Sequence, residues 1–231
     1  MTQLAGKNIL VVGATGALGS RIAARLVAAG ATVVLTGTDR AKLEALGIAG
    51  RQLVVDLADG ARGADGVAAL VADSAGGLDG IVVAAGVVAF GPAAELDAAT
   101  VARLFAVNAT GPIALVSSAL PLLAESAAEG REPFVVTISG IVAESPTAGM
   151  AAYSASKSAL AAFMAAASRE ARRAGIRLLD VRPGHTETGL AGRAIAGTAP
   201  KFPAGLHPDA VADRIVAAIV AAEKDLPSTA F

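Results

Sequence analysis

Short runs of branched apolar residues alternate with helical apolar patterns along the whole chain. Runs rich in Val, Ile and Leu predict buried strands at residues 9–12, 31–36, 52–55, 81–85, 134–138 and 176–181. Apolar residues at helical spacing predict helices at residues 21–29, 40–46, 61–73, 98–125, 151–174 and 208–222. The pattern at 98–125 is interrupted near Gly111-Pro112, and residues 226–231 predict a short last strand.

Strict alternation of strands and helices is typical of an α/β protein with a parallel sheet that helices cover on both faces. Because crossover connections are right-handed, we expect a doubly wound, Rossmann-like sheet that binds ligands at the carboxyl ends of its strands. No linker, repeat or low-complexity tract divides the chain. The pattern therefore predicts a single three-layer α/β/α domain over residues 1–231.

Composition argues against several kinds of partner. The net charge is −1, from 19 basic and 20 acidic residues without a basic run, so we expect no nucleic-acid partner and no polybasic membrane anchor. With no cysteine and two histidines, the chain is expected to hold no metal. Hydrophobic residues make up 54% of the chain and charged residues 17%, so some apolar surface is expected to be buried between subunits.

One uncharged segment, residues 104–124, is long enough to span a bilayer. It also carries Asn108, two serines and two prolines, which a buried or interface helix explains better than lipid does. The first predicted strand begins so near the N-terminus that we expect no secretory signal. We therefore expect a protein without membrane contact and with a cytoplasmic location.

A glycine-rich turn joins the first predicted strand to the first predicted helix. Gly13, Gly16 and Gly19 follow the strand at three-residue spacing. In such a turn the free backbone N–H groups, the helix dipole and the missing Cβ atoms let a pyrophosphate approach closely. A tight turn without a ligand would use the same glycines, but the strand before it and the helix after it favour a dinucleotide site.

The helix predicted from residue 151 carries a second motif, Tyr153-Ser-Ala-Ser-Lys157. Tyr153 and Lys157 share one helix face, so the ammonium is expected to favour the phenolate and to lower the tyrosine pKa towards a range useful for proton transfer. An exposed Tyr/Lys pair is the alternative. Tyr153 is the single tyrosine of the chain and follows a strand that ends near the glycine turn, which favours the catalytic interpretation.

With these motifs in this order, the sequence resembles the single-domain short-chain dehydrogenase/reductase family. The resemblance covers nearly the whole chain, through GATGALG at 13–19, Asp56, VAAG at 83–86, Asn108, Ser139, YSASK at 153–157 and RPGHTET at 182–188. It implies an enzyme that oxidises an alcohol or reduces a carbonyl with NAD(P)(H), and subunits that assemble into a homotetramer or homodimer through the helices at 104–124 and 151–174.

The resemblance also implies a catalytic set. Tyr153 would be the general acid/base, Lys157 would hydrogen-bond the nicotinamide ribose, and Asn108 would hold a water of a proton relay. A serine would donate a hydrogen bond to the substrate oxygen.

The position of that serine is a departure from the family. The residue thirteen positions before the tyrosine, where the family usually has the serine, is Gly140. Ser139 stands one step earlier and Ser145 lies in the following loop, and we favour Ser139. Because neighbouring side chains of a strand point to opposite faces, Gly140 must let the chain twist if Ser139 is to serve.

The cofactor site implied by the resemblance consists of Gly13, Thr15, Gly16, Ala17, Leu18, Gly19, Thr38, Arg40, Asp56, Leu57, Ala85, Gly86, Tyr153, Lys157, Pro183, Gly184, Thr186 and Thr188. An acid at the end of the second strand selects NAD, and a basic residue there selects the 2′-phosphate of NADP. This chain has Gly37 and Thr38 there instead of an acid. NADP(H) is therefore favoured over NAD(H).

The substrate loop implied by the resemblance spans about 185–207. Ile141, Val142, Met150, His185 and Leu190 are expected to line an apolar pocket. That lining predicts a small to medium, largely apolar carbonyl compound or its alcohol. Gly140 keeps a second hypothesis open, a catalytically weakened nucleotide-binding sensor or partner-binding protein on the same fold.

Overall fold

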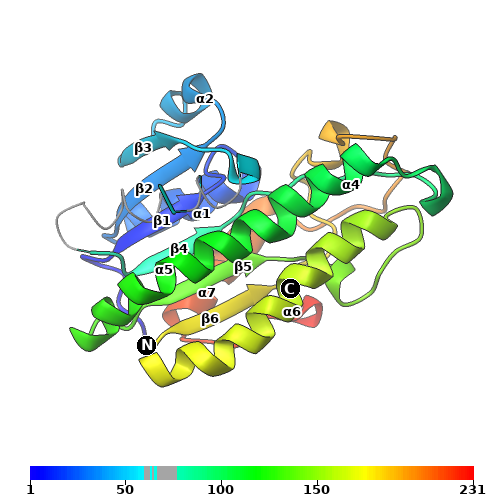
Figure 1. Ribbon diagram of the computed structural model, residues 1–231. Coiled ribbons are helices and arrows are strands. Elements are labelled where there is room, and N and C mark those ends of the chain that lie inside the picture. The colour runs from blue at the N-terminus through cyan, green and yellow to red at the C-terminus, as the bar shows by residue number, and fades with distance from the viewer. Residues whose placement is uncertain (60–62, 64, 67–76) are drawn as a thin grey trace.

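The computed structural model of the chain describes residues 1–59, 63, 65–66 and 77–231 (Figure 1). Within these residues six strands form one parallel sheet in the order β3-β2-β1-β4-β5-β6. The strands are β1 Asn8–Val12, β2 Thr32–Gly37, β3 Arg51–Val54, β4 Gly80–Val83, β5 Phe134–Ile138 and β6 Arg177–Val181. The strand order reverses between β1 and β4, so the predicted doubly wound sheet is confirmed.

Helices cover both faces of the sheet. They are α1 Ala17–Ala28, α2 Arg40–Glu44, α4 Ala98–Phe105, α5 Gly111–Ala128, α6 Ala151–Ala171 and α7 Pro208–Val220. In Figure 1, α5 and α6 run side by side across one face of the sheet, and α7 lies behind it. The helix predicted at 61–73 falls almost entirely outside the described residues.

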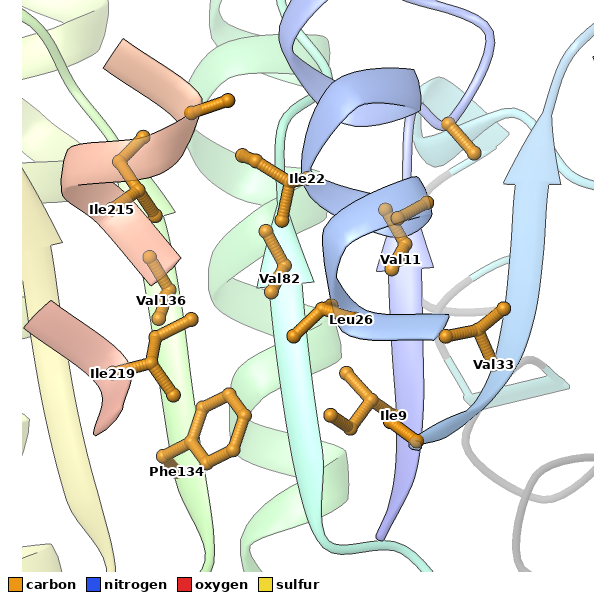
Figure 2. Packing of buried hydrophobic residues seen from close by; sticks show 14 of the residues in the cluster. Ile9, Val11, Ile22, Leu26, Val33, Val82, Phe134, Val136, Ile215 and Ile219 are labelled. Atoms are coloured by element: carbon orange, nitrogen blue, oxygen red, sulfur yellow. The ribbon is translucent and has the colours of Figure 1, made fainter. Parts of the chain in front are cut away.

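Two apolar layers hold the helices on the sheet. Figure 2 shows Ile22 and Leu26 of α1 and Ile219 of α7 directed towards Val82 and Phe134 on the strands, and each of these side chains is fully buried. Burying one such side chain stabilises the fold by roughly 1.5–3 kcal/mol. Leu115, Val116 and Leu123 of α5 and Leu160 and Met164 of α6 belong to the corresponding layer on the other face. The near-continuous apolar strands seen in the sequence follow from burial on both sides.

The predicted interruption of the long helix is a π-helical turn, Ala106–Thr110, between α4 and α5. Pro112 has no N–H group, so it cannot donate the hydrogen bond that an α-helix would place on the Asn108 carbonyl. Gly111 is also required there, since a Cβ on it would lie 2.5 Å from the Leu57 carbonyl oxygen. The continuous stretch Ala98–Ala128 is, among the described residues, the one segment long and apolar enough to cross a membrane, and half of its most apolar window is buried in the fold.

The prediction of a last strand at 226–231 was wrong. Leu226 forms one isolated parallel bridge with Val181, and Ser228–Ala230 is a short 3₁₀ turn. Pro227 has no N–H to continue the ladder beside β6, which limits the pairing to a single bridge.

Candidate active site

The glycine turn between β1 and α1 is tightly packed. Gly13 has φ +77°, and a Cβ on it would lie 2.7 Å from the Ala85 backbone after β4. A Cβ on Gly19 would overlap the Gly13 carbonyl oxygen, so α1 can lie against the turn only if residue 19 is glycine. Gly16 is the N-cap of α1, and without a side chain it leaves the first helical N–H groups available to an anion.

A cavity of about 470 Å³ begins at this turn and runs along the carboxyl ends of the strands. Of the eighteen residues predicted to bind the cofactor, all but Gly19 and Arg40 line it. Gly19 lies under the turn, and Arg40 is exposed at the start of α2, where Asp39 caps the helix. All five residues predicted for the substrate pocket also line the cavity.

Several cavity residues had no signal in the sequence. Arg103 of α4 lines the cavity and forms an ion pair with Asp56 at 3.1 Å. Thr147 and Arg193 line it from the two loops at the substrate end. A lone arginine on a helix surface and polar residues of loops carry no spacing pattern, so the sequence did not single them out.

Tyr153 and Lys157 occupy the first two turns of α6 and both line the cavity. Lys157 is only 5% exposed, and its ammonium donates to the Ile138 carbonyl at the end of β5 at 2.8 Å. Burial raises the pKa of Tyr153 to about 12. The expectation that Lys157 lowers the tyrosine pKa is not met in this structure, where burial of the phenol sets the direction of the shift.

Burial also lowers the pKa of Lys157, to about 8, although the Asp180 charge raises it. Between pH 8 and 10 the unfolded chain therefore binds more protons at this residue than the folded chain, and stability must rise with pH. We expect the unfolding free energy of the wild type, relative to Lys157→Met, to increase by about 2 kcal/mol across this window. Above pH 10 the raised pKa of Tyr153 lowers the unfolding free energy as the pH rises, because the folded chain then holds the phenol proton that the unfolded chain has lost.

Chemical denaturation of both proteins at a series of pH values measures this difference. Parallel curves for the wild type and Lys157→Met between pH 8 and 10 would show that the buried amine does not titrate in this range.

Ser139 reaches the cavity edge, but its hydroxyl proton is engaged. Its Oγ donates to Asp180 Oδ2 at 2.5 Å, and the side chain is 1% exposed. Gly140 takes φ +80°, and the N–H groups of both residues donate to the Val181 carbonyl, at 3.0 and 3.2 Å. The chain therefore turns at Gly140, directly after Ser139. Ser145 is exposed in the loop and does not line the cavity.

Asn108 sits at the centre of the π-helical turn, fully buried and beside the cavity lining. Its Oδ1 accepts from the Val87 N–H at 2.9 Å, and its Nδ2 donates to the Val87 carbonyl at 2.9 Å and to Ser156 Oγ at 3.1 Å. The side chain thus clamps the segment after β4 to α6. A Cβ on Gly86 would lie 3.4 Å from Asn108 Oδ1 and 3.3 Å from Lys157 Nζ.

Removing this clamp should be costly. Asn108→Ala is expected to lower the unfolding free energy by about 3 kcal/mol, because the N–H and carbonyl of Val87 and the hydroxyl of Ser156 each lose a hydrogen bond to Asn108. Thr110→Ala is the matched control, since this exposed residue of the same turn makes one 3.3 Å bond to the Phe105 carbonyl. Urea unfolding of the two variants gives the comparison, and equal losses would contradict the clamp.

The far end of the cavity is apolar. Phe90, Val142, Met150 and Phe202 pack around Tyr153. His185 stacks on Phe202 with ring centroids 4.7 Å apart. A single parallel bridge of Ala89 with Ala196 ties the loop predicted at 185–207 to the segment after β4, and a bridge of Thr186 with Leu206 joins the two ends of the loop. No group of three His, Cys, Asp or Glu residues in the described part of the chain could hold a metal ion.

Comparison with known proteins adds sequence evidence to this geometry. The family model for short chain dehydrogenase matches residues 7–198. The cyclic-di-GMP-binding biofilm dispersal mediator protein of Escherichia coli (strain K12) is 35% identical over 191 residues, covering 81% of this chain and 76% of that protein. The 2,3-dihydro-2,3-dihydroxybenzoate dehydrogenase of the same strain is 33% identical over 188 residues, covering 81% and 73%.

Among solved structures, the 3-ketoacyl-(acyl-carrier-protein) reductase from Brucella melitensis, complexed with NADH, superimposes with a TM-score of 0.86. It is 24% identical, and the match covers 98% of this chain and 99% of that one. This likeness supports the fold. Together with the family match over most of the sequence, it shows that the chain belongs to the short-chain dehydrogenase family of NAD(P)-dependent oxidoreductases.

Proposed function

We propose that the protein interconverts a small to medium, largely apolar carbonyl compound and its alcohol, with Tyr153 as general acid/base. One observation carries this proposal: Tyr153 lies in a single cavity between the glycine turn and an apolar end. A nicotinamide ring on one side and an apolar substrate on the other would then both lie beside the Tyr153 hydroxyl. Turnover of a panel of apolar ketones and secondary alcohols with NADPH, NADP, NADH and NAD tests it.

The cavity fits a nicotinamide dinucleotide. The glycine turn forms a cradle that Cβ atoms would fill, and the N-terminus of α1 is open to a diphosphate. When bound, the nicotinamide ring accepts or supplies the hydride. Lys157 would hydrogen-bond the nicotinamide ribose with protons that its bond to Ile138 leaves free, because an ammonium has three.

Tyr153 would exchange a proton with the substrate oxygen. Its raised pKa keeps the phenol protonated at neutral pH, in the form that donates to a carbonyl being reduced. Ser139 would donate a hydrogen bond to the same oxygen. To do so, its hydroxyl must give up the hydrogen bond that it donates to Asp180. Asn108 would hold the relay water through its main-chain carbonyl, which lacks the α-helical donor that Pro112 cannot supply.

For the cofactor we propose NADP(H) over NAD(H). An acidic side chain at position 37 would repel the 2′-phosphate of NADP. This chain has Gly37 there, and a Cβ on it would lie 3.0 Å from Thr15 Cγ2, so the position disfavours any side chain. Thr38 lines the cavity beside it without a charge. Equilibrium binding of NADPH and NADH decides the point, and tighter binding of NADH would reverse the assignment.

We also propose a cytoplasmic homotetramer or homodimer that acts on a small molecule without a membrane or nucleic-acid partner. Partly exposed apolar side chains of α5 and α6, among them Ile113, Leu120 and Phe163, support a subunit interface on this face. Light scattering at micromolar concentration is expected to give at least twice the mass of the chain. A monomer at that concentration would contradict the interface.

A second candidate is a nucleotide-binding sensor with weakened catalysis. Two observations favour it: Gly140 replaces the family's serine, and the Ser139 proton is committed to Asp180. A relative named for cyclic-di-GMP binding is 35% identical. Calorimetry with cyclic-di-GMP and NADPH, beside the turnover panel, separates the candidates. Tight binding of either nucleotide without turnover of any substrate would favour the sensor.

A further inference from the structure

Asp180 of β6 is a buried carboxylate to which the proposed reaction assigns no role. It is 8% exposed. Its Oδ1 accepts from Thr137 Oγ1 at 2.7 Å and its Oδ2 from Ser139 Oγ at 2.5 Å. Arg182 Nη1 lies 3.4 Å from Oδ2. A buried carboxylate is costly unless it is paired or serves a function, so its place in the sheet needs a reason.

The strand register places this carboxylate on the α6 side of the sheet. Thr137 pairs directly with Asp180, and alternate residues of a strand share one face. Val135 and Leu178, two residues earlier on each strand, pack with α5 and α6 in the same apolar layer. Asp180 therefore faces the helix that carries Lys157.

Lys157 and Asp180 are both held by residues at the end of β5. The lysine ammonium donates to the carbonyl of Ile138, and the next residue, Ser139, holds Asp180. The lysine is 5% exposed, so water contributes little to the stability of its charge. A buried ammonium without a nearby negative charge tends to lose its proton.

Two other cations near this site have carboxylate partners. Arg182, which follows β6, pairs at 2.5 Å with Glu144, which follows the 3₁₀ turn Ile141–Ala143, and at 2.5 Å with Asp225, besides its 3.4 Å contact with Asp180. Arg103 of α4 pairs with Asp56 at 3.1 Å. Tyr153, on α6 itself, is neutral at neutral pH because burial raises its pKa. Asp180 is the group whose charge raises the Lys157 pKa against the effect of burial.

We propose that Asp180 is a positioning residue of the active site, which holds the buried Lys157 in its charged form, with its carboxylate fixed by the hydroxyls of Thr137 and Ser139. Asp180 acts through Lys157, and it is not assigned contact with the substrate. Its value for catalysis rests on the proposed function, since a charged Lys157 is what that reaction uses.

The first test measures Lys157 directly and needs no substrate. The chain has five lysines, so ¹³Cε-labelled lysine gives few NMR signals, and the signal absent from Lys157→Met assigns residue 157. In Asp180→Asn the titration midpoint of this signal is expected to fall by about one pH unit. An unchanged midpoint would overturn the proposal.

Asp79→Asn is the matched control. Asp79 is a fully buried carboxylate that accepts from Ser126 Oγ and from the Asn8 N–H, and it directly precedes β4, at the amino end of the strands and away from the cavity. It should lower thermal stability while leaving the Lys157 midpoint unmoved. An equal fall in both variants would assign the shift to general loosening and overturn the proposal.

The second test is kinetic. If the proposed reaction needs charged Lys157, the alkaline midpoint of kcat/KM should move to lower pH by the same shift in Asp180→Asn and stay in place in Asp79→Asn. A loss of rate with an unmoved midpoint would indicate a merely structural role. If the wild type turns over no substrate of the panel but the NMR midpoint still shifts, the proposed function fails and the role of Asp180 in charging Lys157 stands.

A variant that does not fold would not end the test. The double variant Thr137→Val/Asp180→Val removes the carboxylate together with one hydroxyl that would otherwise lose its partner, and apolar replacement of both sides of a buried pair is usually tolerated. The same fall of the Lys157 midpoint is expected in it. A midpoint equal to that of the wild type would overturn the proposal.

Discussion

Tyr153→Phe is expected to lower kcat/KM by about 10³-fold, within the range that a positioned general acid/base contributes. The substitution removes one oxygen and keeps the ring, so the apolar packing against Phe90, Met150 and Phe202 is retained. Dinucleotide binding should stay within a few-fold of the wild type, because the glycine turn is untouched. Steady-state turnover and equilibrium titration of the cofactor measure the two effects separately.

The control for this prediction is Ser168→Ala. Ser168 lies on α6 about three turns beyond the lysine, and its hydroxyl donates to the Ala165 carbonyl. This variant should leave kcat/KM unchanged. Turnover of Tyr153→Phe within threefold of the wild type would remove the phenol from the chemistry. A parallel loss of cofactor binding would instead mean that the ring, not the hydroxyl, was disturbed.

Gly19→Ala is expected to lower the unfolding free energy by about 2–4 kcal/mol and to weaken dinucleotide binding by about 100-fold. The added Cβ would overlap the Gly13 carbonyl oxygen, and its next contacts would be the Gly13 carbonyl carbon at 2.9 Å and the Ala14 Cα at 3.0 Å. All three are main-chain atoms of the turn, so α1 must move away from the sheet. The N–H groups of its first turn would then no longer point at the diphosphate position.

Gly192→Ala tests whether glycine replacement as such has this cost. A Cβ at residue 192 meets nothing within 4 Å, and the residue does not have a positive φ. Thermal unfolding and NADPH titration of this variant should match the wild type. A Gly19→Ala protein that binds NADPH normally would show that the close contact of α1 with the turn is unnecessary for the site.

The elements were largely readable from the sequence because each depends on local pattern. The apolar runs at 9–12 and 134–138 became β1 and β5 with at most one residue of difference. The break near Gly111-Pro112 is a π-helical turn in the structure, and it was readable because the missing N–H of a proline is a local property that does not depend on the tertiary fold. The failed strand at 226–231 shows the limit of this approach, since an apolar start did not outweigh the missing N–H of Pro227.

The residues of the cavity were readable for a different reason. Residues that follow parallel strands meet at one sheet edge, so turns such as Gly13–Gly16 and Pro183-Gly184 had to gather there once the strand order was known. Arg40 was expected in the cavity, but it begins α2 and is exposed, because the position of a residue shortly after a strand does not say which way its side chain points. Arg103 was missed because nothing in a helix pattern distinguishes a cavity-facing arginine from a solvated one.

The sequence by itself determined the order of strands and helices, the glycine turn and the pairing of Tyr153 with Lys157 on one helix, because spacing and periodicity are local properties. Only the tertiary structure decided the chemical state of these groups. The raised pKa of Tyr153 and the lowered pKa of Lys157 come from burial by several elements. Ser139 meets Asp180 from 41 residues away, because two parallel strands bring them side by side.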